Sequence, residues 1–185
     1  WNGTNYTIKD NSLILMYNFD NVSALGETDT KVVDLSGAGN NGTVYGGNST
    51  STDTPFGIGR SMQFNGVSDY VEVPDNANLD IARTDKKTLS AWVKSNNTGT
   101  EVIFEKQAIG TSWRRQGYQF VIMSDGKISF NLRNDFVIQS IKVVTTNNIS
   151  KPDVWENYVL TLDGTGTTSG VTIYKNGVSQ ALDLI

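Results

Sequence analysis

Carboxylates are the side chains that could perform acid–base chemistry in this chain, because it contains no histidine and no cysteine. Two glutamates in the strand pattern E-x-D-x-x-E would supply the nucleophile and the acid/base of a retaining glycoside hydrolase. The glutamates are Glu27, Glu72, Glu101, Glu105 and Glu156, and none stands in that pattern. Glu101 and Glu105 are four residues apart instead of the five in that pattern, and Ile103 stands at the aspartate position. We therefore expect no enzymatic activity.

Residues 111–116 (TSWRRQ) form the second group with recognisable chemistry. An exposed aromatic ring can stack on a sugar face, and arginine can donate paired hydrogen bonds to carboxylate or hydroxyl groups. Trp113, Arg114 and Arg115 are therefore candidate ligand-binding residues in an expected loop. The alternative interpretation is a solvated loop whose tryptophan packs on the edge of the fold.

The composition excludes several classes of site and partner. Without cysteine there is no disulfide framework, zinc–thiolate site or thiol catalysis. Without histidine, a bound metal is expected to be a hard cation held by oxygen ligands, with calcium the leading candidate. The net charge of -4 argues against nucleic acid as a partner. No apolar run approaches the roughly 20 residues that span a membrane.

Sequence motifs for N-glycosylation are in mild excess over what the composition alone would produce. They begin at Asn2, Asn5, Asn21, Asn41, Asn48, Asn96 and Asn148. One interpretation is composition alone, and the other is a glycosylated exterior protein. The chain begins at Trp1, and we interpret it as a processed or trimmed piece of a longer secreted product.

Strand patterns dominate the chain, and nothing predicts a long amphipathic helix. Asp125-Gly126 is a tight-turn dipeptide between two alternating runs and predicts a hairpin. Residues 46–55 are expected to form a surface loop. Trp92 and Trp155 are expected to fill a core. The predicted strands cover residues 12–19, 31–34, 43–45, 61–64, 70–73, 88–94, 102–104, 117–123, 127–132, 136–144, 155–162 and 171–174.

Several segments, in this order, resemble laminin-G-like jelly-roll domains of the concanavalin A-like lectin/glucanase type. They are residues 13–20 (LILMYNFD), 33–37 (VDLSG), 40–44 (NNGTV), 56–66 (FGIGRSMQFNG), 69–74 (DYVEVP), 89–94 (LSAWVK), 160–164 (LTLDG) and 173–177 (IYKNG). The resemblance implies an all-β, antiparallel, two-sheet jelly-roll sandwich. It places a laminin-G-like domain at residues 11–185, after an N-terminal extension at residues 1–10.

The chain departs from the family pattern in two places. Asn157 stands where the family has a histidine after Trp155, and the final family strands, which would pack beside residues 13–19, are missing after residue 177. Either another strand fills the slot, or the chain is a fragment, or a neighbouring molecule supplies a strand.

The resemblance also implies a structural calcium ion held by Asp20 and Asn40, with a backbone carbonyl of the same loop. A late aspartate that is often a further ligand in the family is absent. The alternative is that Asp20 and Asn40 only cap turns through local hydrogen bonds.

Three functions remain open at the level of sequence. The first is a non-catalytic carbohydrate-binding or adhesion module of a larger secreted or cell-surface protein, with a glycan or another surface protein as partner. The second is a structural subunit of an extracellular assembly, such as a fibre, a pilus-like filament or a surface layer, that self-assembles by strand exchange. The third is an accessory module of an extracellular glycoside hydrolase.

Overall fold

The computed structural model describes residues 12–47, 49–109, 115–134 and 139–185. The chain divides into two compact units, Trp1–Leu79 and Asp80–Ile185, which are described separately below. Within the described part, no helix has the length and apolar character that would cross a membrane. The predicted division into an extension at residues 1–10 and a domain at residues 11–185 stays a prediction.

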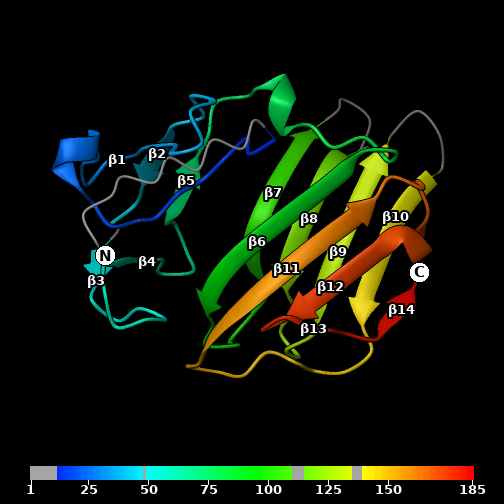
Figure 1. Cartoon of the computed structure of the whole chain (residues 1–185). Coiled ribbons are helices and arrows are strands. Elements are labelled where there is room, and N and C mark those ends of the chain that lie inside the picture. Colours follow the sequence, from blue (N-terminus) through cyan, green and yellow to red (C-terminus); the bar gives the residue numbers. More distant parts are fainter. Residues whose placement is uncertain (1–11, 48, 110–114, 135–138) are drawn as a thin grey trace, which may run out of the picture. The chain divides into compact units, whose positions relative to one another are not determined.

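The second unit consists of two antiparallel sheets, which Figure 1 shows as two layers. The five-stranded sheet has the order β14-β10-β9-β8-β7, and the four-stranded sheet has the order β13-β12-β11-β6. The bounds are β6 Lys86–Lys94, β7 Glu101–Ile109, β8 Arg115–Ile122, β9 Ile128–Asn134, β10 Gln139–Thr145, β11 Trp155–Asp163, β12 Val171–Lys175, β13 Val178–Ser179 and β14 Leu182–Leu184, with a short 3-10 helix η3 at Thr168–Gly170.

Apolar side chains from the facing sides of both sheets form one core. The five-stranded sheet contributes Tyr118, Phe120, Ile122, Ile128, Phe130, Leu132, Ile141 and Val143. The four-stranded sheet contributes Tyr158, Leu160, Leu162, Val171 and Ile173. Removing this apolar surface from water is the main force that holds the two sheets together.

The two-residue period of β11 decides which of its side chains enter the core. Tyr158, Leu160 and Leu162 are buried, as the alternation predicts. Trp155 lies on the opposite face of the strand and is half-buried. Trp92 of β6 pairs with Asn157 on that outer face and is 43% exposed. The expectation that both tryptophans fill the core was therefore wrong, because their positions in the alternation direct them outward.

The predicted hairpin at Asp125-Gly126 is confirmed. Strands β8 and β9 pair antiparallel from Gly117 with Arg133 to Ile122 with Ile128. Gly126 has a φ of 79°, in the left-handed region that glycine adopts without steric cost. Strand β7 is longer than predicted and contains an irregularity between Val102 and Phe104.

The described residues of the first unit form two small antiparallel sheets. Strands β1, β2 and β5 form one, and β3 and β4 form the other (Figure 1). The region 46–55, predicted as a loop, contains strand β3, which pairs with β4. The bounds are η1 Ser23–Leu25, β1 Lys31–Val32, β2 Gly42–Tyr45, β3 Ser49–Ser51, β4 Ser61–Gln63, β5 Tyr70–Glu72 and η2 Ala77–Leu79.

Residues 12–19, predicted as a strand, belong to no strand in the structure. Loop groups satisfy part of the segment's backbone instead of a sheet ladder. Asp34 Oδ1 accepts the Met16 N–H at 3.0 Å, and Asn40 Nδ2 donates to the Ile14 carbonyl at 2.6 Å. The backbone N–H of Leu35 donates to the Met16 carbonyl at 2.9 Å. The apolar run predicted a strand because periodicity cannot detect such side-chain partners.

The predicted fold class is confirmed. The structure is mostly strand, its sheets are antiparallel, and the second unit has a core between two sheets. This arrangement agrees with a concanavalin A-like jelly-roll sandwich.

Candidate functional site

The predicted ligand-binding residues fall largely outside the part of the chain that the structure describes. Trp113 and Arg114 lie outside the described residues. Arg115 begins β8, but its side chain also lies outside the described part. The assignment of these three residues to ligand binding therefore stays a prediction.

The calcium candidates Asp20 and Asn40 occupy two different hydrogen-bond networks. Asp20 Oδ1 accepts the Arg60 N–H at 2.7 Å, and Oδ2 accepts Asn18 Nδ2 at 3.1 Å. Asn40 is buried, and its Oδ1 accepts Asn76 Nδ2 at 2.9 Å. Among the described residues, no three Asp, Glu, His or Cys side chains gather in a way that could hold a metal. Calcium binding by this pair stays a prediction.

Asp34 organises the loop that contains Asn40. Its carboxylate accepts the backbone N–H groups of Met16, Ser36 and Asn40, together with the Ser36 hydroxyl, at 2.8–3.0 Å. Burial alone would raise the pKa of Asp34, but these hydrogen bonds outweigh it and hold the pKa below its usual value. The Tyr17 hydroxyl donates to the Asn40 carbonyl, and burial followed by the charge of Asp34 raises the pKa of Tyr17 to about 12.

Four of the seven glycosylation motifs begin on described residues. Asn41, Asn96 and Asn148 are exposed, whereas Asn21 is half-buried and donates from Nδ2 to Asp29 at 2.9 Å. Asn2, Asn5 and Asn48 lie outside the described part. The modification of each of these asparagines stays a prediction.

Glu101 and Glu105 both lie on β7, where Glu101 is half-buried. Burial raises the pKa of Tyr158, and the charge of Glu101 contributes to this rise. Glu105 is exposed and accepts Nε2 of Gln119 at 2.7 Å from the neighbouring strand β8. Such a contact ties two strands together and does not place two carboxylates across a substrate bond.

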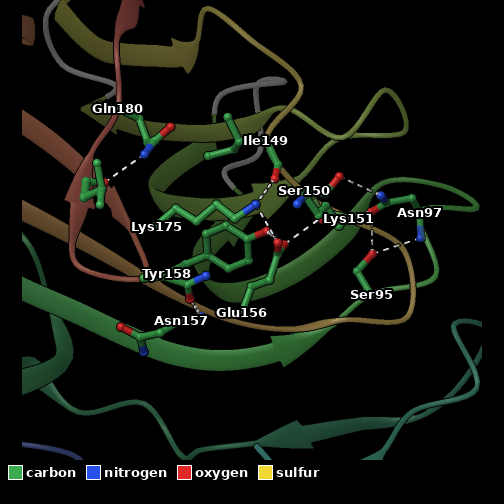
Figure 2. Close-up of polar contacts among 12 residues, drawn as sticks. Ser95, Asn97, Ile149, Ser150, Lys151, Glu156, Asn157, Tyr158, Lys175 and Gln180 are labelled. Carbon is green, nitrogen blue, oxygen red and sulfur yellow. Dashed lines mark hydrogen bonds and ion pairs between the residues drawn. The ribbon is translucent and has the colours of Figure 1, made fainter.

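A buried ionic network that the sequence did not predict lies at one end of β11 (Figure 2). Glu156 Oε1 lies 2.5 Å from Lys175 Nζ, and the two side chains are 3% and 15% exposed. Glu156 Oε2 accepts the Lys151 N–H at 3.0 Å and the Tyr158 hydroxyl at 2.5 Å. Lys175 also donates to the Ile149 carbonyl. Burial, and then the hydrogen bond to Glu156, raises the pKa of Tyr158.

The network fixes the connection between β10 and β11. Both oxygens of Glu156 are occupied within the protein, so this carboxylate is a structural anchor and not an acid poised for substrate. Beside it, Asn97 Oδ1 accepts the Ser150 hydroxyl at 3.0 Å, and Nδ2 donates to the Ser150 carbonyl at 3.1 Å (Figure 2). The sequence signal was a glutamate at an inward position of an alternating strand.

A shallow depression of about 290 Å³ lies in the first unit, between the end of β4 and the turn before β5. Its lining is polar apart from one aromatic ring and consists of Gly47, Ser49, Gln63, Phe64, Asn65 and Asp69. The sequence predicted these residues as part of a surface loop and of segments that resemble the family, and did not predict a binding site here. Only the pairing of β3 with β4 and of β2 with β5 brings the three segments together.

Backbone groups hold the Asp69 carboxylate in this depression. Oδ1 accepts the Gly47 N–H and Oδ2 accepts the Asn65 N–H, each at 3.0 Å. A Cβ atom on Gly46 would lie 2.0 Å from Asp69 Oδ1, so a glycine is required at position 46. Each carboxylate oxygen can accept a further hydrogen bond, and Asp69 can therefore accept a ligand hydroxyl.

The remaining lining residues complement this carboxylate. The Ser49 hydroxyl donates to Gln63 Oε1 at 3.1 Å across the β3–β4 pair. Phe64 is 49% exposed and provides the apolar surface. An exposed aromatic face beside several hydrogen-bonding groups can contact the apolar face and the hydroxyl groups of a sugar.

A second exposed aromatic feature lies on the sheet formed by β1, β2 and β5. Tyr45 and Tyr70 pair across β2 and β5, and their rings stack with centroids 4.9 Å apart. Both rings are about half exposed. A cross-strand aromatic pair of this kind stabilises a sheet, and this role accounts for the contact.

The antiparallel two-sheet sandwich of the second unit is the architecture of a concanavalin A-like β-sandwich domain. The family model described as the concanavalin A-like lectin/glucanases superfamily, of laminin G type, matches residues 64–182. The chain belongs to this superfamily. A comparison with curated proteins gave no match.

A solved structure supports the fold. The chain is similar to a crystal structure of an S-layer domain-containing protein from Clostridium thermocellum, with 23% sequence identity and a TM-score of 0.56. The similarity covers 91% of this chain and 71% of that chain. At this level of identity, the comparison shows a shared fold.

Proposed function

We propose that the chain is a non-catalytic carbohydrate-binding module of a secreted or cell-surface protein. The observation that carries this proposal is the depression around Asp69. A carboxylate with spare acceptor capacity, amide and hydroxyl groups and an exposed phenyl ring are the groups that recognise a sugar. Membership of a superfamily of lectins and glucanases supports the same ligand class.

The surroundings of Glu156, Glu105 and Asp69 support binding without hydrolysis. Glu156 is occupied by Lys175 and Tyr158, and Glu105 is exposed beside Gln119. Among the described residues, Asp69 is the one carboxylate in the lining of the depression. A glycosidase of the usual kind needs two carboxyl groups across the scissile bond.

A glycan array followed by calorimetric titration tests the proposal. We expect the protein to bind a subset of glycans. Asp69→Asn should weaken binding by about tenfold or more, since a hydrogen bond to a charged group contributes about 1.5–3 kcal/mol. Phe64→Ala should weaken binding by about tenfold, because it removes the aromatic surface that contacts the sugar. Phe56→Ala is the matched control because Phe56 is 67% exposed in the same unit but does not line the depression. The proposal is wrong if no glycan binds, or if reducing ends accumulate when the protein is incubated with the bound glycan.

A structural role in a surface assembly is the second candidate. Strand β6 is terminal in the order of its described sheet, and a nine-residue edge strand can pair with a strand from another molecule. The similar crystal structure carries the name of an S-layer domain-containing protein, which agrees with this role. Electron microscopy of the purified protein would show ordered polymers if this role is correct, and monomers at all concentrations would contradict it.

A further inference from the structure

Glu27 in the first unit is a buried carboxylate with an unsatisfied oxygen. The residue is 2% exposed. Its Oε2 accepts the Val22 N–H at 2.7 Å, whereas its Oε1 is buried and has no hydrogen-bond partner among the described residues. An ionised carboxylate in this state costs several kcal/mol unless a cation or further donors compensate it.

The unsatisfied side chain borders a small cavity. The cavity holds about 10 Å³, which is about the space of one water molecule or one bare ion. Its polar lining includes Glu27, Asp29, Asn21 and Thr28, with Lys31 at one wall. Phe19, Val32 and Met62 close the apolar side.

The side chains in this lining that can act as metal ligands offer oxygen atoms, whereas the Lys31 ammonium group has no lone pair to donate. Asn21 donates from Nδ2 to Asp29 at 2.9 Å, which leaves its Oδ1 as an acceptor or ligand. Carboxylate, amide and hydroxyl oxygens in an irregular arrangement suit calcium, which takes six to eight oxygen ligands at variable geometry. Magnesium is less suited, because it demands octahedral geometry and keeps several waters.

We propose that this cavity is a calcium site in which Glu27 Oε1 is the central ligand and Asp29 and Asn21 contribute further oxygens. The site lies at residues different from the pair Asp20 and Asn40, whose side-chain oxygens are engaged in separate networks. A calcium ion there compensates the buried charge of Glu27 and ties η1 and the following turn to β1.

The test measures calcium and magnesium binding by calorimetry, together with the melting temperature in calcium and in EDTA. Wild-type protein is expected to bind one calcium ion with at least tenfold preference over magnesium and to melt several degrees higher with calcium. Glu27→Gln is expected to weaken calcium binding at least tenfold and to abolish the calcium-dependent rise in melting temperature. Asp29→Asn is expected to weaken binding as well.

Two variants make the test specific. Asp20→Asn removes the carboxylate of the other candidate site and is expected to retain calcium binding. Glu105→Gln is the matched control for charge, since Glu105 is exposed and lies in the second unit. The proposal is overturned if Glu27→Gln binds calcium like the wild type, if Asp20→Asn alone abolishes binding, or if the wild type binds no calcium and the cavity holds water only. If Glu27→Gln fails to fold, the test relies on Asp29→Asn. Calcium binding by Asp29→Asn that equals the wild type then overturns the proposal.

Discussion

At the scale of single residues, three charged side chains fasten loops of this protein. Glu156, Lys175 and Asp34 each make several contacts that fasten loops, and each is largely or partly shielded from solvent. Buried charges are costly unless every lone pair finds a partner, so these contacts are sensitive to substitution.

Removing one partner of the Glu156–Lys175 pair should destabilise the protein strongly. We expect Glu156→Ala to lower the free energy of unfolding by about 3–5 kcal/mol, because Lys175 would remain as a buried and uncompensated charge. The double variant Glu156→Leu with Lys175→Met should recover part of that loss. Urea unfolding measures both, with Glu105→Ala as an exposed control. Equal losses for Glu156→Ala and Glu105→Ala would contradict the structural role.

Asp34 should make stability depend on pH in the acid range. Its pKa is lowered in the folded state, so the unfolded state takes up a proton at a higher pH. The stabilisation is present above the unfolded pKa of about 3.9 and is lost as pH falls through the folded pKa.

Urea midpoints from pH 7 to pH 2.5 measure this dependence. Asp34→Asn should be less stable than the wild type at neutral pH, and the difference should shrink below about pH 4. Asp163, whose pKa is also lowered by hydrogen bonds from Thr165, provides the comparison variant Asp163→Asn. A difference for Asp34→Asn that stays constant across this pH range would exclude the carboxylate as the cause.

At the scale of elements, the close pairing of two strands can require glycine at a single position. Gly117 lies in β8 with a φ of 128°, and a Cβ there would lie 1.9 Å from the backbone carbonyl oxygen of Lys106 on β7. The two strands approach more closely than any side chain at position 117 would permit.

Gly117→Ala should therefore reduce the free energy of unfolding by about 3 kcal/mol or more. Gly99→Ala is the matched control, because a Cβ added to Gly99 would meet no heavy atom of another segment within 4 Å. Thermal unfolding of both variants checks the prediction. A Gly117→Ala variant that melts like the wild type would show that β7 and β8 can separate at this point at little cost.

At the scale of the whole molecule, the chain contains a concanavalin A-like sandwich, a polar depression and a buried ionic network. Family membership, strand content and the two-sheet core agree with one another. The binding proposal and the calcium proposal rest on separate sets of residues, so each can fail without the other.

A comparison of the variants Glu27→Gln and Phe64→Ala would show that glycan binding and calcium binding are independent. Glu27→Gln should bind glycans at saturating concentrations like the wild type when it is folded, whereas Phe64→Ala should bind calcium like the wild type. Calorimetry of each variant with each ligand gives the four measurements. Loss of both activities in Phe64→Ala would indicate unfolding of the first unit, and circular dichroism would detect it.

The sequence alone determined the all-β class, the hairpin at Asp125-Gly126, the inward face of β11 and the family, because strand period and turn chemistry are local properties. It did not determine that residues 12–19 form no strand with any described segment or that Trp92 lies on the outer face of its sheet. Nor did it determine that Glu156 pairs with Lys175, or that one Glu27 oxygen has no hydrogen-bond partner in the described part of the chain. Those features depend on contacts between residues distant in the chain. Such contacts form only when the register of strand pairing sets which side chains face each other.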